Sequence, residues 1–189
     1  METIMTLGSH FLISWLSSVN FLKERRERTV ITVAGISPDL DALGGIIDSI
    51  TGTTNYYQQF HHYFGHSGLF GIFVAFLAFT LARNQKKMTV FLSLAVFHLH
   101  LICDLIGSKG PDGYQWPIYY FYPFNTDVGF IWSRQWELNA WQNQLILASL
   151  LYTCFVYAKT QRVTFIEVIS PRLQTALYKM VDKYSTKRV

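Results

Sequence analysis

The chain has 189 residues, of which 50% are hydrophobic and only 15% are charged. Since an average soluble domain carries about 25% charged residues, this composition disfavours an ordinary soluble enzyme and favours a membrane protein or an unusually apolar bundle. The net charge is +4, and the two cysteines, Cys103 and Cys154, lie in separate apolar runs, which excludes a disulfide framework and a paired-cysteine zinc site.

The first half of the chain contains two apolar stretches that predict helices, at residues 4–22 and 68–82. Glu2 precedes the first stretch and no basic segment does, so we expect no cleaved signal peptide. The segment "SPDLDALGGIIDSI" (37–50) predicts a helix with Ser37 as its N-cap and Pro38 at its first position. Residues 51–65 are typical of a loop or an irregular helix.

The second half adds apolar helices at residues 88–106 and 144–158, separated by a loop rich in Gly, Pro and aromatic residues at 107–135. Apolar residues near helical spacing make residues 164–185 amphipathic. We therefore predict an all-α helical bundle whose apolar helices are candidates to span a membrane. It comprises a helical domain at 1–163 and an amphipathic basic tail at 164–189.

Ionisable side chains segregate if these helices run up and down. Basic clusters at residues 23–28, 83–87 and 159–162 then fall at one end, and the histidines and aspartates of interest fall at the other. In a membrane, the positive-inside rule makes the basic end cytoplasmic. We therefore expect membrane lipid, and no nucleic acid, as the partner of this chain.

The histidine and aspartate end has the chemistry of a metal site. His100 and Asp104 are four residues apart and share one face of a helix, whereas His98 points the other way. Asp39 and Asp41 flank Leu40 at a predicted helix start. Imidazole and carboxylate ligands suit zinc, manganese or iron, and a set without thiolates favours a catalytic site with an open position for water.

Simpler interpretations exist for each part of this set. Asp39 and Asp41 could only stabilise a helix N-terminus. A buried histidine such as His98 or His62 could be an ordinary hydrogen-bonded core residue, and an HxxxD pair arises often by chance. The convergence of all the motifs at one end of the bundle favours the metal site.

Four motifs in order resemble the membrane-bound metal-dependent hydrolases of the YdjM type. They are "GSH" (8–10), "SPDLD" (37–41), "HHYFGHS" (61–67) and "HLICDLIGSKG" (100–110), followed by "QWPIYYFYPF" (115–124). The resemblance covers residues 8 to 137. Four positions differ: His62 and Tyr63 replace an Arg-Gly pair, and Gly65 and Ser108 replace threonines.

The resemblance implies seven metal-site residues, two of which, Asp39 and Asp41, would also be catalytic. They are His10, Asp39, Asp41, His61, His66, His100 and Asp104. Of these, His10 and His61 could either bind a second metal or orient the other ligands. Motif spacing assigns His61, whereas regular helix spacing would pair His62 with His66, so His62 stays open. Glu137 resembles a late family glutamate and is a further candidate.

The family is in turn similar to the all-helical zinc-dependent phospholipase C and nuclease group. No histidine follows His100 in this chain, so we expect one or two divalent ions, zinc first and manganese or iron as alternatives. The implied function is hydrolysis of a small-molecule or lipid ester or phosphoester in the inner membrane. A small membrane transporter and a non-catalytic metal-binding or regulatory protein are the alternatives, and the oligomeric state is not indicated.

Overall fold

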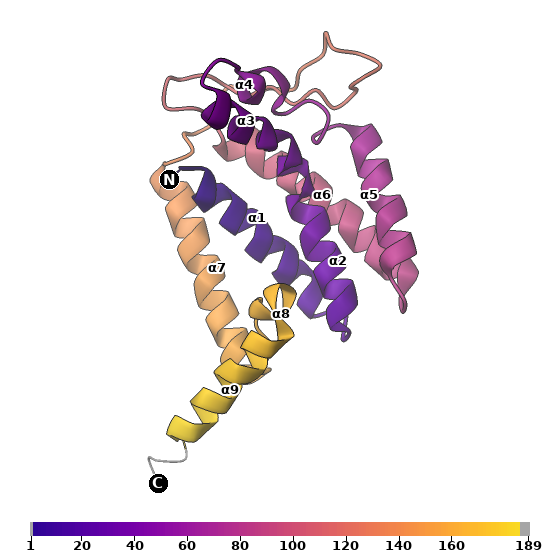
Figure 1. Cartoon of the computed structure of the whole chain (residues 1–189), viewed down its shortest axis with the longest axis vertical. Coiled ribbons are helices and arrows are strands. Elements are labelled where there is room, and N and C mark those ends of the chain that lie inside the picture. The colour runs from indigo at the N-terminus through magenta and orange to yellow at the C-terminus, as the bar shows by residue number, and fades with distance from the viewer. Residues whose placement is uncertain (1, 186–189) are drawn as a thin grey trace.

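The computed structural model describes residues 2–185, with side chains from 7 to 183. Over this range all regular elements are helices, joined by loops (Figure 1). The long helices are α1 (Glu2–Val19), α2 (Arg25–Ile36), α5 (Gly68–Leu81), α6 (Lys86–Gly107) and α7 (Trp141–Thr160). The shorter elements are η1 (Ser37–Leu43), α3 (Gly44–Thr51), α4 (Tyr56–Phe60), α8 (Ile166–Ile169) and α9 (Pro171–Ser185). Within the described range only isolated β-bridges occur and no strand forms, which confirms the all-α prediction.

The five long helices run up and down and pack around two apolar clusters (Figure 1). One cluster joins α2, α5 and α6 through side chains such as Ile31, Val74 and Phe97. The other joins α1 to α7 through Leu12, Trp15 and Cys154. Helix α2 lies at the centre, because it packs against both α1 and α6.

Gly35 allows the close contact between α1 and α2. A Cβ atom at this position would lie 1.8 Å from the Ser14 hydroxyl oxygen and 3.2 Å from a methyl carbon of Val96. No other residue type fits such a close approach without a shift of one helix. The backbone of α2 is thereby brought close to both α1 and α6.

The predicted helix start at Ser37 was wrong. The Ser37 hydroxyl donates backwards to the carbonyl oxygen of Ala34 at 2.8 Å, and no side-chain cap forms there. The helical chain instead continues from α2 through the 3₁₀ helix η1 into α3. Pro38 is compatible with this path because its fixed φ suits the first turn of a helix. Asp39 and Asp41 therefore lie on a tight 3₁₀ segment rather than in the first turn of a new α-helix.

Two helical segments are long and apolar enough to cross a membrane. They are Arg25–Thr51 and α6, and in the most apolar 18 residues of each the bundle buries 33% and 44% of the residues. Twenty-two residues of α6 correspond to about 33 Å, slightly more than the hydrocarbon thickness of a bilayer. The apolar helix α5 is shorter and exposes large side chains such as Ile72 and Phe76.

The basic segments gather at one end of the bundle, as expected from the alternation of the helices. The α1–α2 connection, the α5–α6 connection and the end of α7 all lie at the lower end in Figure 1. The Glu27 carboxylate joins two of them, because it accepts hydrogen bonds from the backbone amides of Arg83 and Asn84 at 3.0 and 2.9 Å. The motif-bearing loops lie at the upper end.

The C-terminal segment is docked at this basic end through a buried ion pair. Arg28 Nη2 lies 2.6 Å from Glu167 Oε2, and the indole nitrogen of Trp15 donates to Glu167 Oε1 at 2.9 Å. Both partners of the ion pair are buried. Helix α8 is thus attached to α1 and α2, whereas α9 extends away from the bundle (Figure 1).

Candidate metal centre

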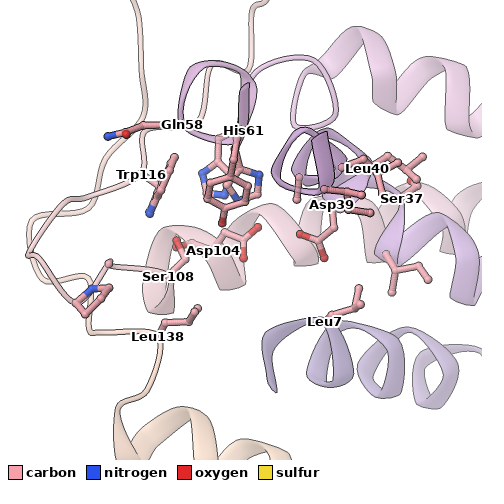
Figure 2. Close-up of a pocket in the computed structure, with 18 of the residues that line it drawn as sticks. Leu7, Ser37, Asp39, Leu40, Gln58, His61, Asp104, Ser108, Trp116 and Leu138 are labelled. Carbon is pink, nitrogen blue, oxygen red and sulfur yellow. The ribbon is translucent and has the colours of Figure 1, made fainter. Parts of the chain in front are cut away.

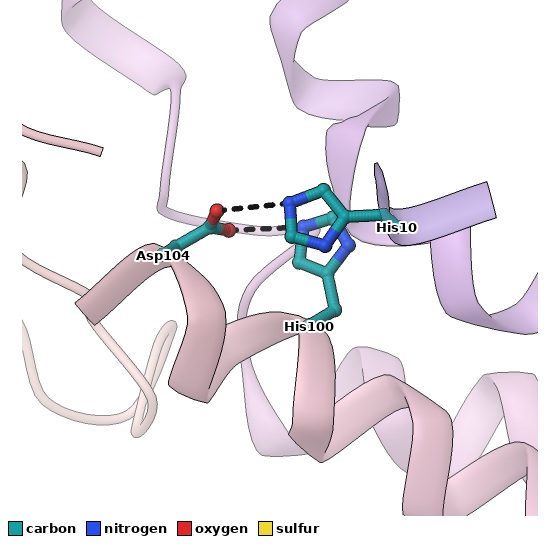
Figure 3. Close-up of side chains that lie close together, drawn as sticks. All are labelled: His10, His100 and Asp104. Carbon is teal, nitrogen blue, oxygen red and sulfur yellow. Dashed lines mark hydrogen bonds and ion pairs between the residues drawn. The ribbon is translucent and has the colours of Figure 1, made fainter. Parts of the chain in front are cut away.

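Three histidine side chains from separate elements converge on the carboxylate of Asp104. Its Oδ1 atom lies 3.2 Å from His10 Nε2 on α1, as shown in Figure 3. Its Oδ2 atom lies 3.2 Å from His66 Nε2, just before α5, and 3.0 Å from His100 Nε2 on α6. All four side chains are buried. The structure thereby brings together four of the seven predicted metal-site residues.

The orientation of His100 leaves a nitrogen lone pair facing the centre. His100 Nδ1 lies 2.8 Å from the Gly35 carbonyl oxygen, which can only accept, so Nδ1 carries the proton. In the neutral ring Nε2 is then an unprotonated acceptor, and it has no hydrogen-bond partner. Facing an Asp104 oxygen at 3.0 Å, this lone pair is unfavourable unless a proton or a metal ion lies between the two atoms. A histidine held by a backbone carbonyl is typical of metal ligands.

Asp41 faces two histidines rather than the Asp104 centre. Its Oδ1 lies 2.9 Å from His61 Nδ1, and its Oδ2 lies 2.9 Å from His66 Nδ1. Oδ2 also accepts the backbone N–H of His62 at 3.0 Å. These contacts favour a role in orienting imidazoles, since the opposite nitrogen of His66 points to Asp104. The sequence had predicted a ligand or catalytic role for Asp41.

His66 lies between two carboxylates, and this environment changes its protonation. Burial lowers the pKa of His66, but hydrogen bonds to Asp104 and Asp41 outweigh burial and raise the pKa to about 10. Without a metal the ring is therefore an imidazolium that donates from both nitrogens. When a metal binds Nε2, that proton must leave, while Nδ1–H remains bonded to Asp41.

Asp39 lies beside the centre and is more open to solvent. Its Oδ1 is 3.6 Å from His100 Nε2, and its side chain is 25% exposed. It can share a metal with His66 and His100, because one donor atom from each lies within 4.8 Å of the others. Asp39 is thus placed between the buried ligands and the adjoining pocket.

The described residues contain three overlapping groups that could hold a metal ion. The groups are His10–His100–Asp104, Asp39–His66–His100 and His62–His66–Asp104. Each pair of groups has at least one residue in common, so they form one continuous centre with donors for one or two ions. The donor set of imidazole nitrogens and carboxylate oxygens suits zinc and also accommodates manganese or iron.

His61 and His62 both lie beside this centre. His61 bonds Asp41 and stacks on Tyr57, and it belongs to none of the three groups. His62 has an unusual positive φ of 68°, is buried, and leaves Nδ1 without a partner. Burial, followed by the nearby His66 and His61, holds the pKa of His62 well below its usual value. Its neutral ring is therefore available as a ligand, and the choice between the two histidines stays open.

Gly65, which stands where the family has threonine, fits its surroundings closely. A Cβ atom there would lie 2.3 Å from the Pro38 carbonyl oxygen and 3.1 Å from Asp41 Oδ2. The backbone around residues 61–66 therefore packs directly on η1. Glycine at this position keeps Asp41 within reach of both His61 and His66.

The side chains of His98 and Glu137 lie away from the centre. His98 is on the other face of α6, where its ring nitrogens contact the Leu94 carbonyl at 2.8 Å and the Tyr120 hydroxyl at 3.0 Å. Glu137 is exposed on the long loop and belongs to none of the three groups. The structure thus gives His98 a role in holding the loop, and it does not bring Glu137 to the centre.

Gln135 and Gly35 also support the centre, although no sequence motif indicated either of them. The Gln135 amide nitrogen donates to the Asp104 carbonyl at 2.7 Å and lies 3.1 Å from the Ser108 hydroxyl. It therefore holds the end of α6, which carries Asp104, against the long loop. Neither Gln135 nor Gly35 carries a motif signal in a single sequence, because each acts through one backbone contact.

A pocket of about 910 Å³ opens next to the centre (Figure 2). Asp39, Asp104, His61 and His62 are among its polar lining residues. Its apolar lining comes from α1, α2, η1 and α3 on one side, and from Trp116 and Leu138 of the long loop on the other. This volume lies within the usual range for small-molecule sites.

One family model, described as YdjM inner membrane protein, matches residues 5–181 of the chain. This range includes every residue of the candidate centre. Comparisons with curated proteins and with solved structures gave no match.

Proposed function

The chain belongs to the YdjM inner membrane protein family, and on that premise we propose that it is a metal-dependent hydrolase of an ester or phosphoester. The observation that carries this proposal is the unpaired Nε2 lone pair of His100, which faces Asp104 at 3.0 Å beside an open pocket. A buried donor set of this kind is costly unless a cation is bound. An adjoining pocket gives a substrate access to it.

The residues of the chain have separate roles in this proposal. His10, His66, His100 and Asp104 would hold the metal, with Asp39 and His62 available for a second ion. A divalent ion bound there supplies Lewis acidity and lowers the pKa of a bound water toward about 7. Asp39, which faces the pocket, can accept a proton from the attacking water at Oδ1. Asp41 orients His61 and His66 through the contacts described above.

The distribution of buried polar groups favours an enzyme over a transporter. Five buried hydroxyl side chains lie between the two ends of the bundle, namely Ser14, Ser18, Thr32, Thr89 and Ser93. Apart from Ser93, each hydroxyl donates a hydrogen bond to the backbone carbonyl three or four residues earlier in the sequence. Such hydroxyls support helix packing, and no buried ionisable group of the described residues connects the centre with Glu27 and Arg28.

Metal content tests the ligand assignment. Protein purified without chelator should contain one or two divalent ions per chain, and Asp104→Ala should lose them because Asp104 contacts all three imidazoles. The matched control is His98→Ala on the same helix, which should keep the metal. Equal metal content in the wild type and in Asp104→Ala would refute the assignment.

Activity tests the hydrolase itself. Zinc- or manganese-loaded protein should cleave a generic phosphodiester or carboxylic ester, a chelator should stop the reaction, and added metal should restore it. Asp39→Asn keeps the shape and removes the charge, so it should lower both turnover and metal affinity. Bound metal without cleavage of any ester, in a folded sample, would favour the non-catalytic or transporter function.

A further inference from the structure

We infer that the substrate is a membrane amphiphile whose long alkyl or acyl chain lies on one apolar wall of the pocket, with its ester at the metal centre. This inference rests on the proposed hydrolase function and adds the substrate class. The apolar wall is the set of pocket residues Leu7, Val33, Ile36, Leu40, Leu43 and Ile46. Four steps support the inference.

The apolar wall is large and is left uncovered by the bundle. The exposed fractions are 51% for Val33, 54% for Leu40 and 52% for Leu43, although all three line a pocket. Leu7 extends the wall onto α1, so apolar side chains lie on both sides of the Asp39 carboxylate in Figure 2. An apolar surface that adjoins convergent polar groups is the usual composition of a small-molecule site.

The apolar wall begins at the metal centre itself. Leu40 directly follows Asp39, and Val33 is six residues before Asp39 along one nearly continuous helical path. Six residues of helix correspond to about 9 Å. A chain attached to a head group at Asp39 could therefore extend along the wall toward the basic end of the bundle.

The depth of the centre matches the position of a lipid head group. His100 and Asp104 are 14 and 18 residues after Lys86, the first residue of α6, so they lie about 21 and 27 Å along that helix. The hydrocarbon core is about 30 Å thick. If α6 crosses the bilayer from its basic end, Asp104 lies near the opposite interface. The part of the apolar wall on α2, at Val33 and Ile36, then points from that interface toward the bilayer centre, as a lipid chain does.

The charges of the pocket make apolar contact the main source of affinity. No lysine or arginine is among the described residues that line the pocket, whereas Asp39, Asp104 and Asp112 are. A ligand with several negative charges would have only the metal to attract it. For a ligand that reaches the wall from water, each buried methylene group contributes roughly a fourfold gain in affinity. A chain of several methylenes is therefore sufficient to hold a weakly charged head group.

Photo-cross-linking tests chain binding without turnover. The full chain in detergent micelles, treated with chelator, is given a trace of phospholipid that carries a diazirine in the middle of one acyl chain. Labelling of peptides from residues 33–43 should exceed labelling of the α7 face around Val156 several-fold. An excess of unlabelled single-chain phospholipid should compete with it, whereas the free head group should not.

Two valine substitutions form the matched pair. Val33→Trp fills the apolar wall and should lower its labelling several-fold, whereas Val156→Trp, at an exposed position on α7, should leave it unchanged. Leu43→Trp replaces Val33→Trp if that variant fails to fold. Labelling of the wall no stronger than labelling of α7, or insensitive to both wall substitutions, would overturn the inference.

A chain-length series separates this inference from the proposed hydrolysis. For esters short enough to be monomers in water, kcat/KM should rise roughly fourfold per methylene until the apolar wall is covered, and Val33→Trp should shorten the best chain. Competed labelling without cleavage of any ester would keep the chain site and overturn the hydrolase. Cleavage of short esters with no dependence on chain length, and no labelling, would overturn the amphiphile alone.

Discussion

The Nδ1 atom of His100 lies 2.8 Å from the carbonyl oxygen of Gly35, and this contact joins α6 to α2 at the candidate metal centre. It determines that Nδ1 carries the proton and that Nε2 faces Asp104. The contact depends on the close packing of α1 on α2, because Gly35 has Ser14 directly beside it. Helix packing and ligand orientation are therefore coupled at one glycine.

Gly35→Ala should disturb both packing and metal binding. The new methyl group would meet the Ser14 hydroxyl at 1.8 Å, and relief of such a contact moves α2 at a cost of about 1–3 kcal/mol. The shift displaces the carbonyl that orients His100. We expect a lower metal content and a lower unfolding temperature in detergent, measured by elemental analysis and thermal denaturation.

The control for this prediction is Gly8→Ala on α1. A Cβ atom at Gly8 has no heavy atom within 4 Å, and alanine is the better helix former. Gly8→Ala should therefore keep both the metal and the stability of the wild type. Wild-type metal content in Gly35→Ala would contradict the coupling.

The helices and their alternation could be predicted from the sequence, and much of the site followed from them. Apolar runs indicated α1, α5, α6 and α7 to within a few residues, because the apolar residues of a packed helix lie close together in the sequence. The alternation then placed His10, His66 and Asp104 at one end. Ser37 was misjudged as a cap because its hydroxyl bonds backward to α2, which depends on whether the preceding helix continues.

The contacts of Asp41 and Gly35 could not be predicted in the same way. Whether a carboxylate binds a metal or orients a histidine depends on which atoms it faces, and two residues of a PDxD motif are equivalent in sequence. The contact from Gly35 to His100 spans 65 residues and uses a backbone atom, so the residue type carries no trace of it. The same holds for Gln135, whose amide contacts the Asp104 carbonyl.

Metal binding should release a proton from His66. The pKa of about 10 in the metal-free protein means that the ring is protonated at neutral pH, and a ligand nitrogen must be free of its proton. We expect release of about one proton from His66 per ion bound to it at pH 7.5, and metal affinity that increases up to about pH 10. Calorimetric titration in buffers with different ionisation enthalpies measures both.

The same shift predicts how the metal-free protein responds to pH. Because the pKa of His66 is raised on folding from 6.5 to about 10, its contribution to stability is complete below pH 6.5 and is lost as the pH rises through 10. Asp41→Asn removes one partner and should reduce the effect. Proton release and stability that are the same in Asp41→Asn and in the wild type would contradict the role given to Asp41.

Removal of Glu167 should destabilise the bundle without removing the metal. Glu167 neutralises the buried Arg28 at the basic end, and leaving one partner of a buried ion pair unpaired costs about 3–5 kcal/mol. A chain truncated after residue 163 should therefore unfold at lower temperature than one truncated after residue 170, which keeps Glu167. If both truncated chains unfold at the same temperature, residues 164–170 add no stability, and the ion pair does not have the role given to it.

The orientation of the bundle in the membrane is the last prediction. Basic residues at the α1–α2 and α5–α6 connections favour the cytoplasmic side, and the metal centre then lies near the outer leaflet.

The test uses a background without Cys103 and Cys154 and introduces single cysteines by Asn84→Cys, between α5 and α6, or by Asp112→Cys, on the long loop beside the pocket. Both positions are exposed. In spheroplasts an impermeant maleimide should label Asp112→Cys at once and Asn84→Cys only after lysis, because the second site lies across the bilayer. The reverse pattern would place the metal centre on the cytoplasmic side, and labelling of both sites before lysis would show that the segments do not cross the membrane.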